Sequence, residues 1–282
     1  MNSPIKFGTS GWRGIIAQEF TFENVRLATQ AIADYWNAEL QTPGSAIHGR
    51  KPLVILGHDT RFLGHEFCLA AAEVLAANGL TPLLCERDAP TPVIAHTIRV
   101  KKAIGGINMT ASHNPAEYQG LKFSPSNGAA APPEITKQVE ANVAKRLAEG
   151  WSFKSSVVGT FKCKSIDPRP DYVKQLKNLI DFRAIKQAKL KIGIQLMYGT
   201  GRGYLDTLLE EAGAKVTRFN EEPNPLFGGH HPEPNAEGMA DVAKLMKSSV
   251  SASTPTPTGS ALWTRTAPGS RRIRFSRSPC IT

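Results

Sequence analysis

The sequence predicts an α/β fold in which mixed or mostly parallel sheets are flanked by helices. Short, continuous apolar runs such as Leu53–Gly57 are typical of strands that are buried on both faces. A polar loop and a helical pattern at Glu66–Asn78 follow that run, which gives the strand–loop–helix unit of a parallel sheet. The same order recurs later, where the run Leu190–Met197 is followed by a helical pattern at Tyr204–Ala212.

Residues 1–150 contain the elements of one such domain. Helices are predicted at Phe22–Leu40, Glu66–Asn78, Thr91–Arg99 and Pro132–Gly150. Strands are predicted at Leu53–Gly57, Thr81–Cys85 and Ala103–Ile107. Thr21 can cap the first helix, Gly79 can end the second, and a proline suits the first turn of the third.

A second domain is expected to begin near Pro170, after an irregular link at residues 151–169. It is expected to be partial and to extend over residues 170–249. Helices are predicted at Asp171–Leu179, Tyr204–Ala212 and Ala240–Ser249, and strands at Leu190–Met197 and Val216–Phe219. Residues 250–282 have a different composition and are expected to form a basic tail rich in Ser, Thr, Pro and Arg.

The bulk composition excludes several classes of protein. The 282 residues are 41% apolar and 21% charged, which is ordinary for a globular chain. No apolar run approaches the ~20 residues that a membrane helix needs, and no signal segment opens the chain, so we expect a cytoplasmic protein with no membrane partner. The cysteines are scattered without a Cys-x-x-Cys pair, which indicates neither a zinc site nor a disulfide framework.

The net charge of +10 raises the question of nucleic acid. Residues 250–282 contain five arginines and no acidic residue, so they carry half of this excess. No aromatic-rich basic surface and no known reader motif accompanies them. Nucleic acid is therefore an unfavoured partner. The mild positive excess over the main body suits an anionic small-molecule ligand, but such an excess is more often unselected surface charge.

A polar loop at residues 108–115 is the main candidate site. It follows an apolar run, and its small residues let the backbone approach a ligand closely. Ser112 lies on a tight turn with its hydroxyl available, as a nucleophile requires. Serine beside histidine and asparagine also occurs in ordinary Asx-type turns, so these residues alone leave both interpretations open.

The serine loop belongs to a series of motifs. Thr-Ala-Ser-His-Asn-Pro at 110–115 is preceded by Phe-Gly-Thr-Ser-Gly-Trp-Arg-Gly at 7–14 and followed by Gly-Leu-Lys-Phe at 120–123. Phe-Gly-Gly and Pro-Glu-Pro recur in the loop at 227–234. In this order, over about residues 5 to 248, the chain resembles the alpha-D-phosphohexomutase superfamily (phosphoglucomutase/phosphomannomutase). The resemblance implies an isomerase of carbohydrate metabolism that interconverts hexose 1-phosphates and hexose 6-phosphates.

The resemblance also implies roles for residues of the serine loop. Phosphorylated Ser112 would give its phosphoryl group to a hexose monophosphate, and the resulting hexose bisphosphate would return the other phosphate to Ser112. Lys122 is the candidate general acid/base, because a lysine near other cations can have a lowered pKa. His113 is grouped with the catalytic residues but is expected to orient the loop, since adjacent side chains on a turn rarely face each other.

Further residues match family motifs that bind phosphate or support the loop. Thr9, Ser10 and Arg13 could bind an anion through hydroxyls and a guanidinium, helped by amides of neighbouring glycines. Asp59 and Arg61 match a Gly-x-Asp-x-Arg element that is expected to hold the serine loop in position. The alternative for that pair is a surface ion pair of little energetic weight. Asn114 completes the set of expected substrate- and phosphate-binding residues: Thr9, Ser10, Arg13, Asp59, Arg61 and Asn114.

The family's metal loop is missing from this sequence. In the family, an Asp-x-Asp-x-Asp-Arg loop binds Mg²⁺ together with the phosphoserine, so the resemblance implies Mg²⁺ bound partly through the phosphate of Ser112. Residues 250–282 stand in the place of that loop and contain no Asp, Glu or Lys. The chain also shows no counterpart of the family's third and fourth domains, which select the sugar and hold the distal phosphate.

The genetic code suggests how the loop was lost. New codons made from the last base of one residue's codon and the first two bases of the next permit Asp-x-Asp-Ala-Asp-Arg-Phe-Gly-Ile-Val-Asp-x-Asp-Gly between Ser253 and Ala267. Within that reading, Trp263 followed by Thr264 requires an aspartate. We hypothesise a frameshift near Ser249 or Val250. A chain of this kind is expected to be inactive, or nearly so, as a mutase, and poorly soluble.

Two other classes of function stay open on the sequence. The chain could be a non-catalytic fragment that acts as a binding module. Phosphate on Ser112 in protein taken from cells would favour a surviving catalytic history over this alternative. It could also be a nucleic-acid binder that uses its basic tail, which a salt-dependent gel shift lost on deletion of residues 250–282 would reveal.

Overall fold

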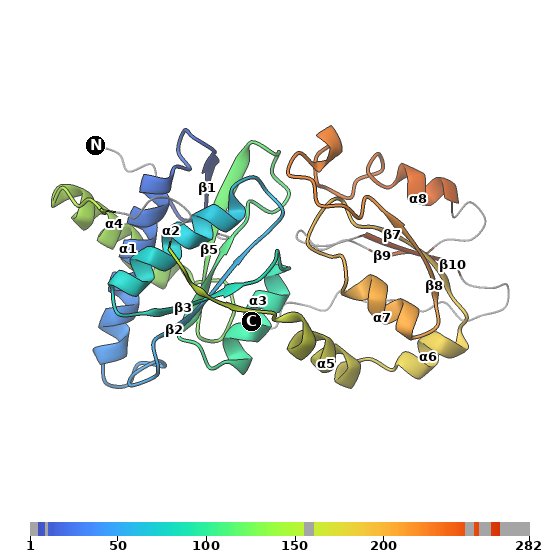
Figure 1. The fold of residues 1–282 in the computed structure, drawn as a ribbon, viewed down its shortest axis with the longest axis horizontal. Coiled ribbons are helices and arrows are strands. Elements are labelled where there is room, and N and C mark those ends of the chain that lie inside the picture. The colour runs from blue at the N-terminus through green and yellow to red at the C-terminus, as the bar shows by residue number, and fades with distance from the viewer. Residues whose placement is uncertain (1–4, 9–10, 155–160, 246–250, 254–260, 266–282) are drawn as a thin grey trace.

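The computed structural model describes residues 5–8, 11–154, 161–245, 251–253 and 261–265. Two sheets lie in separate lobes, the first built by the blue-to-green part of the chain and the second by its yellow-to-red part (Figure 1). Helices pack on both faces of the first sheet. The predicted α/β fold class is confirmed, with a complete first domain and a partial second one.

The first sheet has the strand order β1-β5-β4-β2-β3-β6. Its strands are β1 (Trp12–Ile15), β2 (Leu53–His58), β3 (Thr81–Cys85), β4 (Gly105–Met109), β5 (Tyr118–Pro125) and β6 (Lys164–Ile166). The strands β4, β2, β3 and β6 are parallel, whereas β5 runs antiparallel to both β4 and β1. Parallel strands expose their carboxyl ends at one edge, where ligands meet an α/β sheet.

Helices cover this sheet on both faces. They are α1 (Phe22–Gln41), α2 (Gly64–Ala77), α3 (Thr91–Val100) and α4 (Pro133–Ala148). Residues of α1, α2 and α4 share one apolar core with one face of the sheet, and α3 packs on the opposite face. The Oγ1 of Thr21 accepts a hydrogen bond from the Asn24 amide at 3.2 Å and caps α1, as its sequence predicts.

The second domain has a sheet in the order β8-β7-β10-β9. Its elements are α5 (Arg169–Leu179), α6 (Phe182–Gln187), β7 (Lys191–Gln195), α7 (Leu205–Glu211), β8 (Lys215–Phe219), a 3₁₀ turn (Phe227–Gly229), α8 (Ala240–Leu245), β9 (Ser251–Ser253) and β10 (Ala261–Arg265). The strands β7 and β8 are parallel, and β10 is antiparallel to both β7 and β9.

Several elements were not anticipated from the sequence. The strand β5 contains the Gly-Leu-Lys-Phe motif, which was interpreted as a catalytic motif but was not predicted to be a strand. The helix α6 and the strand β6 are too short for a periodic pattern, and β6 lies in the link expected to be irregular. The strands β9 and β10 lie in the expected tail, where backbone pairing at the exposed edge of β7 needs no apolar pattern. The edge of β7 is therefore covered.

Direct contacts join the two domains. The guanidinium of Arg202, from the second domain, pairs with the buried carboxylate of Asp88 in the first. Lys101 at the end of α3 pairs with Asp171 of α5 at 3.0 Å. The ring of Tyr172 on α5 lies edge-on to that of His96 on α3, with 5.5 Å between centroids. The second domain is thus held against α3, beside the carboxyl edge of the first sheet.

No helix in the part of the chain that the structure describes is both long enough and apolar enough to cross a membrane.

Candidate active site

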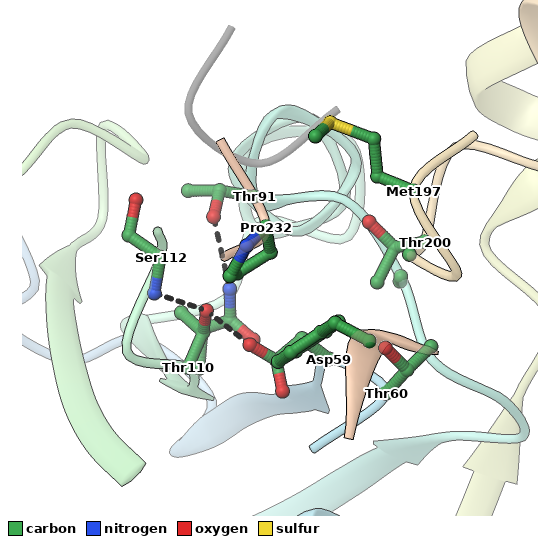
Figure 2. A pocket seen from close by; sticks show the side chains of 12 residues that line it. Asp59, Thr60, Thr91, Thr110, Ser112, Met197, Thr200 and Pro232 are labelled. Atoms are coloured by element: carbon green, nitrogen blue, oxygen red, sulfur yellow. Dashed lines mark hydrogen bonds between the residues drawn. The ribbon is translucent and has the colours of Figure 1, made fainter. Parts of the chain in front are cut away.

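The serine loop leaves the carboxyl end of β4, the central parallel strand next to β5. Ser112 has a φ of 59°, a left-handed conformation that non-glycine residues rarely adopt. Its amide donates to the Oγ1 of Thr110 at 3.0 Å, and the Thr110 hydroxyl donates to the Oδ2 of Asp59 at 2.5 Å (Figure 2). A strained serine held by such a chain of bonds is typical of a functional turn.

Arg61 fixes the rest of the loop. Its side chain is fully buried, and its two terminal nitrogens donate to backbone carbonyls of the loop and the start of β5. The acceptors are the carbonyls of Ser112 at 2.9 Å, Asn114 at 2.6 Å, Pro115 at 2.7 Å and Tyr118 at 3.0 Å. One guanidinium therefore organises the backbone on both sides of Asn114.

Asp59 in turn orients Arg61. Its Oδ1 accepts from the Arg61 amide at 2.9 Å, and its Oδ2 lies 3.2 Å from the Arg61 Nε. Burial raises the pKa of the Asp59 carboxyl, and the charge of Arg61 partly offsets this effect. Burial likewise lowers the pKa of the Arg61 guanidinium. The Arg61 side chain is fully buried and that of Asp59 is 16% exposed, so the alternative of a weak surface ion pair does not apply.

Arg13 reaches the loop from β1. Its Nη1 donates to the Oδ1 of Asn114 at 2.6 Å. Arg13 stands opposite Gly120 in the β1–β5 pairing, and a Cβ at Gly120 would come within 2.5 Å of the Thr110 carbonyl oxygen. Only glycine therefore allows β1, β5 and the serine loop to approach this closely.

Lys122 lies on β5 and is half-buried. Burial lowers the pKa of its amine, and the charge of Arg13 lowers it further, against an opposing effect of Asp59. Lys122 lines an open pocket of about 130 Å³ beside β4, β5 and the start of α3. Ser112 lines a different pocket, and Thr91 and Asn108 line both.

The pocket beside Ser112 lies between the two domains. The first domain contributes Asp59, Thr60, Ala89, Thr91, Asn108, Thr110 and Ser112, and the second contributes Met197, Gly199, Thr200, Phe227 and Pro232. Figure 2 shows side chains of both groups around the same space. The turn after β7, which contains three glycines within residues 199–203, and the Phe-Gly-Gly loop thus line the same pocket as the serine loop.

The remaining predicted residues fall outside this network. The His113 side chain is exposed. Thr9 and Ser10 lie outside the residues that the structure describes. The amide of Gly11 donates to the carbonyl of Gly8 at 3.3 Å, so it is not directed at an anion as the sequence suggested.

Comparisons with known proteins agree with this geometry. Residues 4–149 match the family model of phosphoglucomutase/phosphomannomutase domain I, and residues 170–254 match that of domain II, both described as alpha/beta/alpha. The chain belongs to the phosphoglucomutase/phosphomannomutase family. The predicted relationship to the alpha-D-phosphohexomutases is therefore confirmed.

Individual members of the family are similar over part of their length. Human phosphoglucomutase-1 is 34% identical over 223 residues, which are 69% of this chain and 40% of that protein. The phosphoglucomutase/phosphomannomutase of Thermococcus kodakarensis is 31% identical over 242 residues, which are 86% of this chain and 50% of that protein. A solved structure described as a putative phosphomannomutase, from Thermus thermophilus, superposes with a TM-score of 0.74 at 33% identity and covers 92% of this chain and 56% of that one. The chain spans about half the length, or less, of these relatives.

The expected magnesium site does not fit the side chains of this phosphohexomutase chain. Among the described residues, no three His, Cys, Asp or Glu side chains cluster as metal ligands would. Asp59 is bonded to the serine loop, and both of its oxygens already accept hydrogen bonds, Oδ1 from the Arg61 amide and Oδ2 from the Thr110 hydroxyl. Mg²⁺ is bound by oxygen ligands, and the described side chains of this site do not offer a free set of them.

Sequence reasoning missed four residues of the site. Thr110 was quoted in the motif without a role, although a threonine two residues before a turn serine can bond its amide. Asn108, Thr91 and Phe227 come together only through the fold, and Asn108 could have been noticed as a polar residue in an apolar strand.

Proposed function

We propose that this chain carries the phosphoserine half of a phosphohexomutase active site. In this reaction the Ser112 Oγ holds a phosphoryl group, transfers it to a hydroxyl of a hexose monophosphate, and regains the other phosphate of the resulting hexose bisphosphate. The observation that supports this most strongly is the strained Ser112 on a loop that one buried guanidinium, Arg61, fixes through four carbonyls. Phosphoryl transfer depends more on positioning and charge than on covalent help.

The other residues support this role by their charge and place. Arg13 contacts the serine loop through its hydrogen bond to Asn114. A second cation at the loop favours the binding of phosphate. Lys122 is the proposed general acid/base: its lowered pKa makes the neutral amine, which takes the proton of the attacking hydroxyl, more accessible. His113 and the motif residues Thr9 and Ser10 keep their proposed roles of loop orientation and phosphate binding.

Phosphate transfer to Ser112 tests the half-site directly. The purified 282-residue chain is incubated with glucose 1,6-bisphosphate, and the peptide containing Ser112 is examined by mass spectrometry. We expect a phosphate on Ser112, none on that peptide in Ser112→Ala, and an unchanged result in Ser124→Ala, which alters a serine of the neighbouring cavity. A folded wild-type chain without phosphate on Ser112 would overturn the proposal.

Turnover is a separate question, because the side chains of the described residues do not assemble a metal site. We expect glucose 1-phosphate to be converted to glucose 6-phosphate at a negligible rate by this chain. A family-level rate from the purified protein would contradict that expectation. The binding-module alternative predicts a different result, since a non-catalytic fragment would accept no phosphate on Ser112.

A further inference from the structure

A basic pocket lies at the edge of the first sheet that is opposite to Ser112. Leu53 and Thr81 line this pocket, and they are the first residues of the parallel strands β2 and β3. Ser112 instead follows the carboxyl end of β4, which is parallel to β2. The basic pocket has a volume of about 940 Å³, which is within the range of small-molecule sites. It is therefore a candidate site of its own, separate from the serine loop.

Positive charge is concentrated in the basic pocket. Among the described residues that line it, none is acidic and five are cationic: Arg50, Lys51, Arg99, Lys101 and Lys102. Lys101 forms an ion pair with Asp171 at 3.0 Å. The other four form no ion pair with any residue that the structure describes. Cations that gather without counter-charges attract a multiply charged anion.

The carboxyl end of α3 explains only part of this charge. Arg99 and Lys101 lie in or just after the last turn of α3, where the helix dipole favours cations. Arg50 and Lys51 come instead from the segment just before β2 and are at no helix end. Lys102 has a φ of 53°, the left-handed conformation in which glycine is the usual residue after a helix. A lysine held there at a conformational cost indicates a use for its charge.

An apolar pocket adjoins the basic pocket. It has a volume of about 250 Å³ and shares Ser126 and Asn127 with the basic pocket. Its walls are mostly apolar, and Tyr35 and Glu39 add a hydroxyl and a carboxylate that can hydrogen-bond to a ligand. A few polar groups on apolar walls are typical of a small-molecule site.

The turn shared by the two pockets is well defined. The Gly128 amide donates to the Pro125 carbonyl at 2.9 Å, and the Ala129 amide donates to the Asn127 Oδ1 at 3.0 Å. Gly128 also packs closely on α3, because a Cβ there would lie 2.5 Å from the carbonyl oxygen of Ala95. The two pockets thus lie side by side across a fixed turn, within reach of one ligand.

We propose that these two pockets bind one nucleoside triphosphate, with its phosphates in the basic pocket and its base in the apolar pocket. Several cations suit a chain of phosphates better than a single phosphate, because each cation can bond a different phosphate oxygen. The base is a flat ring that fits between apolar walls, and an exocyclic amine of the base can donate to Glu39. This site goes beyond the proposed phosphoryl transfer at Ser112 and does not depend on it.

ATP without magnesium is the probe, and isothermal titration of the full chain measures its affinity. In Lys51→Ala/Lys102→Gly two cations of the basic pocket are lost, so ATP should bind at least about tenfold more weakly. Lys137→Ala/Lys145→Ala is the matched control, because it removes two exposed lysines of α4. This control should change the affinity by less than about twofold. Equal ATP affinities of the two double variants would overturn the proposal.

The single variant Lys102→Gly separates binding from folding. Glycine adopts the left-handed conformation without strain, so the variant should melt at a temperature no lower than that of the wild type. It should nevertheless bind ATP several-fold more weakly, because one cation of the basic pocket is lost. A Lys102→Gly chain that is equally stable and binds ATP as tightly as the wild type would contradict the proposed place of the phosphates.

Tripolyphosphate tests the place of the base, because it has the phosphates of ATP without the nucleoside. It should respond to Lys51→Ala/Lys102→Gly as ATP does, but it should bind the wild type more weakly than ATP. Ala46→Trp fills the apolar pocket from an exposed position, so it should weaken the binding of ATP and leave that of tripolyphosphate unchanged. Equal wild-type affinities for the two probes, or equal effects of Ala46→Trp on both, would overturn the proposal.

Two further titrations test the location and the class of the ligand. Excess glucose 1,6-bisphosphate should leave the affinity for ATP unchanged, whereas displacement of ATP would place it in the pocket of Ser112. A single-stranded oligonucleotide should bind more weakly than ATP. Tighter binding of the oligonucleotide that Lys51→Ala/Lys102→Gly abolishes would make this a nucleic-acid surface. Either of these opposite results, or a folded wild-type chain that binds no ATP, would overturn the proposal.

Discussion

The ring of Phe227 lies 4.9 Å from the guanidinium carbon of Arg61, across the boundary between the two domains. Arg61 is the residue that holds the serine loop, and Phe227 belongs to the Phe-Gly-Gly loop of the second domain. Phe227 is itself buried, at 5% exposure. The second domain thus contacts the serine loop through the side chain that organises it, and the stability of the loop depends on both domains.

Replacing the Phe227 ring with an aliphatic side chain should weaken its contact with Arg61. We expect Phe227→Leu to lower the free energy of unfolding by about 1–2 kcal/mol, because both the cation–π attraction and part of the apolar packing are lost. Urea denaturation measures the change. Phe62→Leu is the control, since Phe62 is 58% exposed and should change stability by less than about 0.5 kcal/mol. Equal effects of the two substitutions would argue against the contact.

Removing the guanidinium should be more damaging. Arg61→Met leaves the Asp59 carboxylate without its cation and four backbone carbonyls without their donor, and breaking a buried charged pair destabilises a protein by about 3–5 kcal/mol. Arg61→Lys keeps the charge but cannot bond several carbonyls at once, so an intermediate loss is expected. Hydrogen exchange should show reduced protection at residues 111–118 in both variants. A serine loop as protected in Arg61→Met as in the wild type would refute this role.

The first domain was largely predictable because its signals are local. Strand β3 was predicted with its observed bounds, and α1 and β2 each differ by one residue at the carboxyl end. Long amphipathic helices and buried parallel strands each have a regular pattern of apolar residues, which can be recognised in the sequence. The edge strands β1, β6 and β9 lack such patterns, because edge pairing depends on what the neighbouring strand leaves exposed.

The site residues that lie in sequence motifs were predictable, whereas contacts that arise only from the fold were not. Ser112, Asp59 and Arg61 lie in motifs, and their mutual contacts follow from adjacent parallel strands ending at one edge. The pairing of Asn108 with Lys122 depends on the register of β4 against β5, and β5 was not predicted as a strand. A one-residue change of that register would turn Lys122 to the opposite face.

The domain boundary has its own testable ion pair. Asp88 is 6% exposed and is held by the guanidinium of Arg202, which also donates to the Gly199 carbonyl at 2.9 Å. Arg202→Leu leaves a buried carboxylate without its cation, and we expect a loss of about 3 kcal/mol with the two domains melting separately in calorimetry. The control Arg183→Leu removes an exposed arginine and should leave the melt unchanged. Identical melts for the two variants would contradict a role of this ion pair in holding the two domains together.

The frameshift hypothesis makes a prediction about the gene. An independent reading of the nucleotides from the codon of Lys244 onward should reveal one base gained or lost near codon 250, with Asp-x-Asp-Ala-Asp-Arg in the restored frame. The restored protein should convert glucose 1-phosphate, because the missing metal ligands return. A confirmed nucleotide sequence without this hidden frame would make residues 250–282 a genuine part of the protein. Assays of binding, not of turnover, would then be appropriate.

Lys122 predicts a dependence of stability on pH. Burial, followed by the charge of Arg13, lowers its pKa in the folded chain below its ordinary value of 10.5. At neutral pH the folded state therefore carries an unfavourable charge that Lys122→Met removes. As pH rises from the folded pKa to the unfolded one, the folded chain releases this proton while the unfolded chain keeps it, so the wild type gains stability.

The stability advantage of Lys122→Met should accordingly be largest near pH 7 and shrink toward pH 10. Urea denaturation at several pH values measures the difference between the variant and the wild type, in which the titration of all other groups cancels. Lys145→Met, at an exposed position of α4, should show no such trend. A difference that stays constant with pH would mean that Lys122 keeps an ordinary pKa in the fold. Its candidacy as a proton acceptor would then lose its physical basis, because the neutral amine would be too scarce near pH 7.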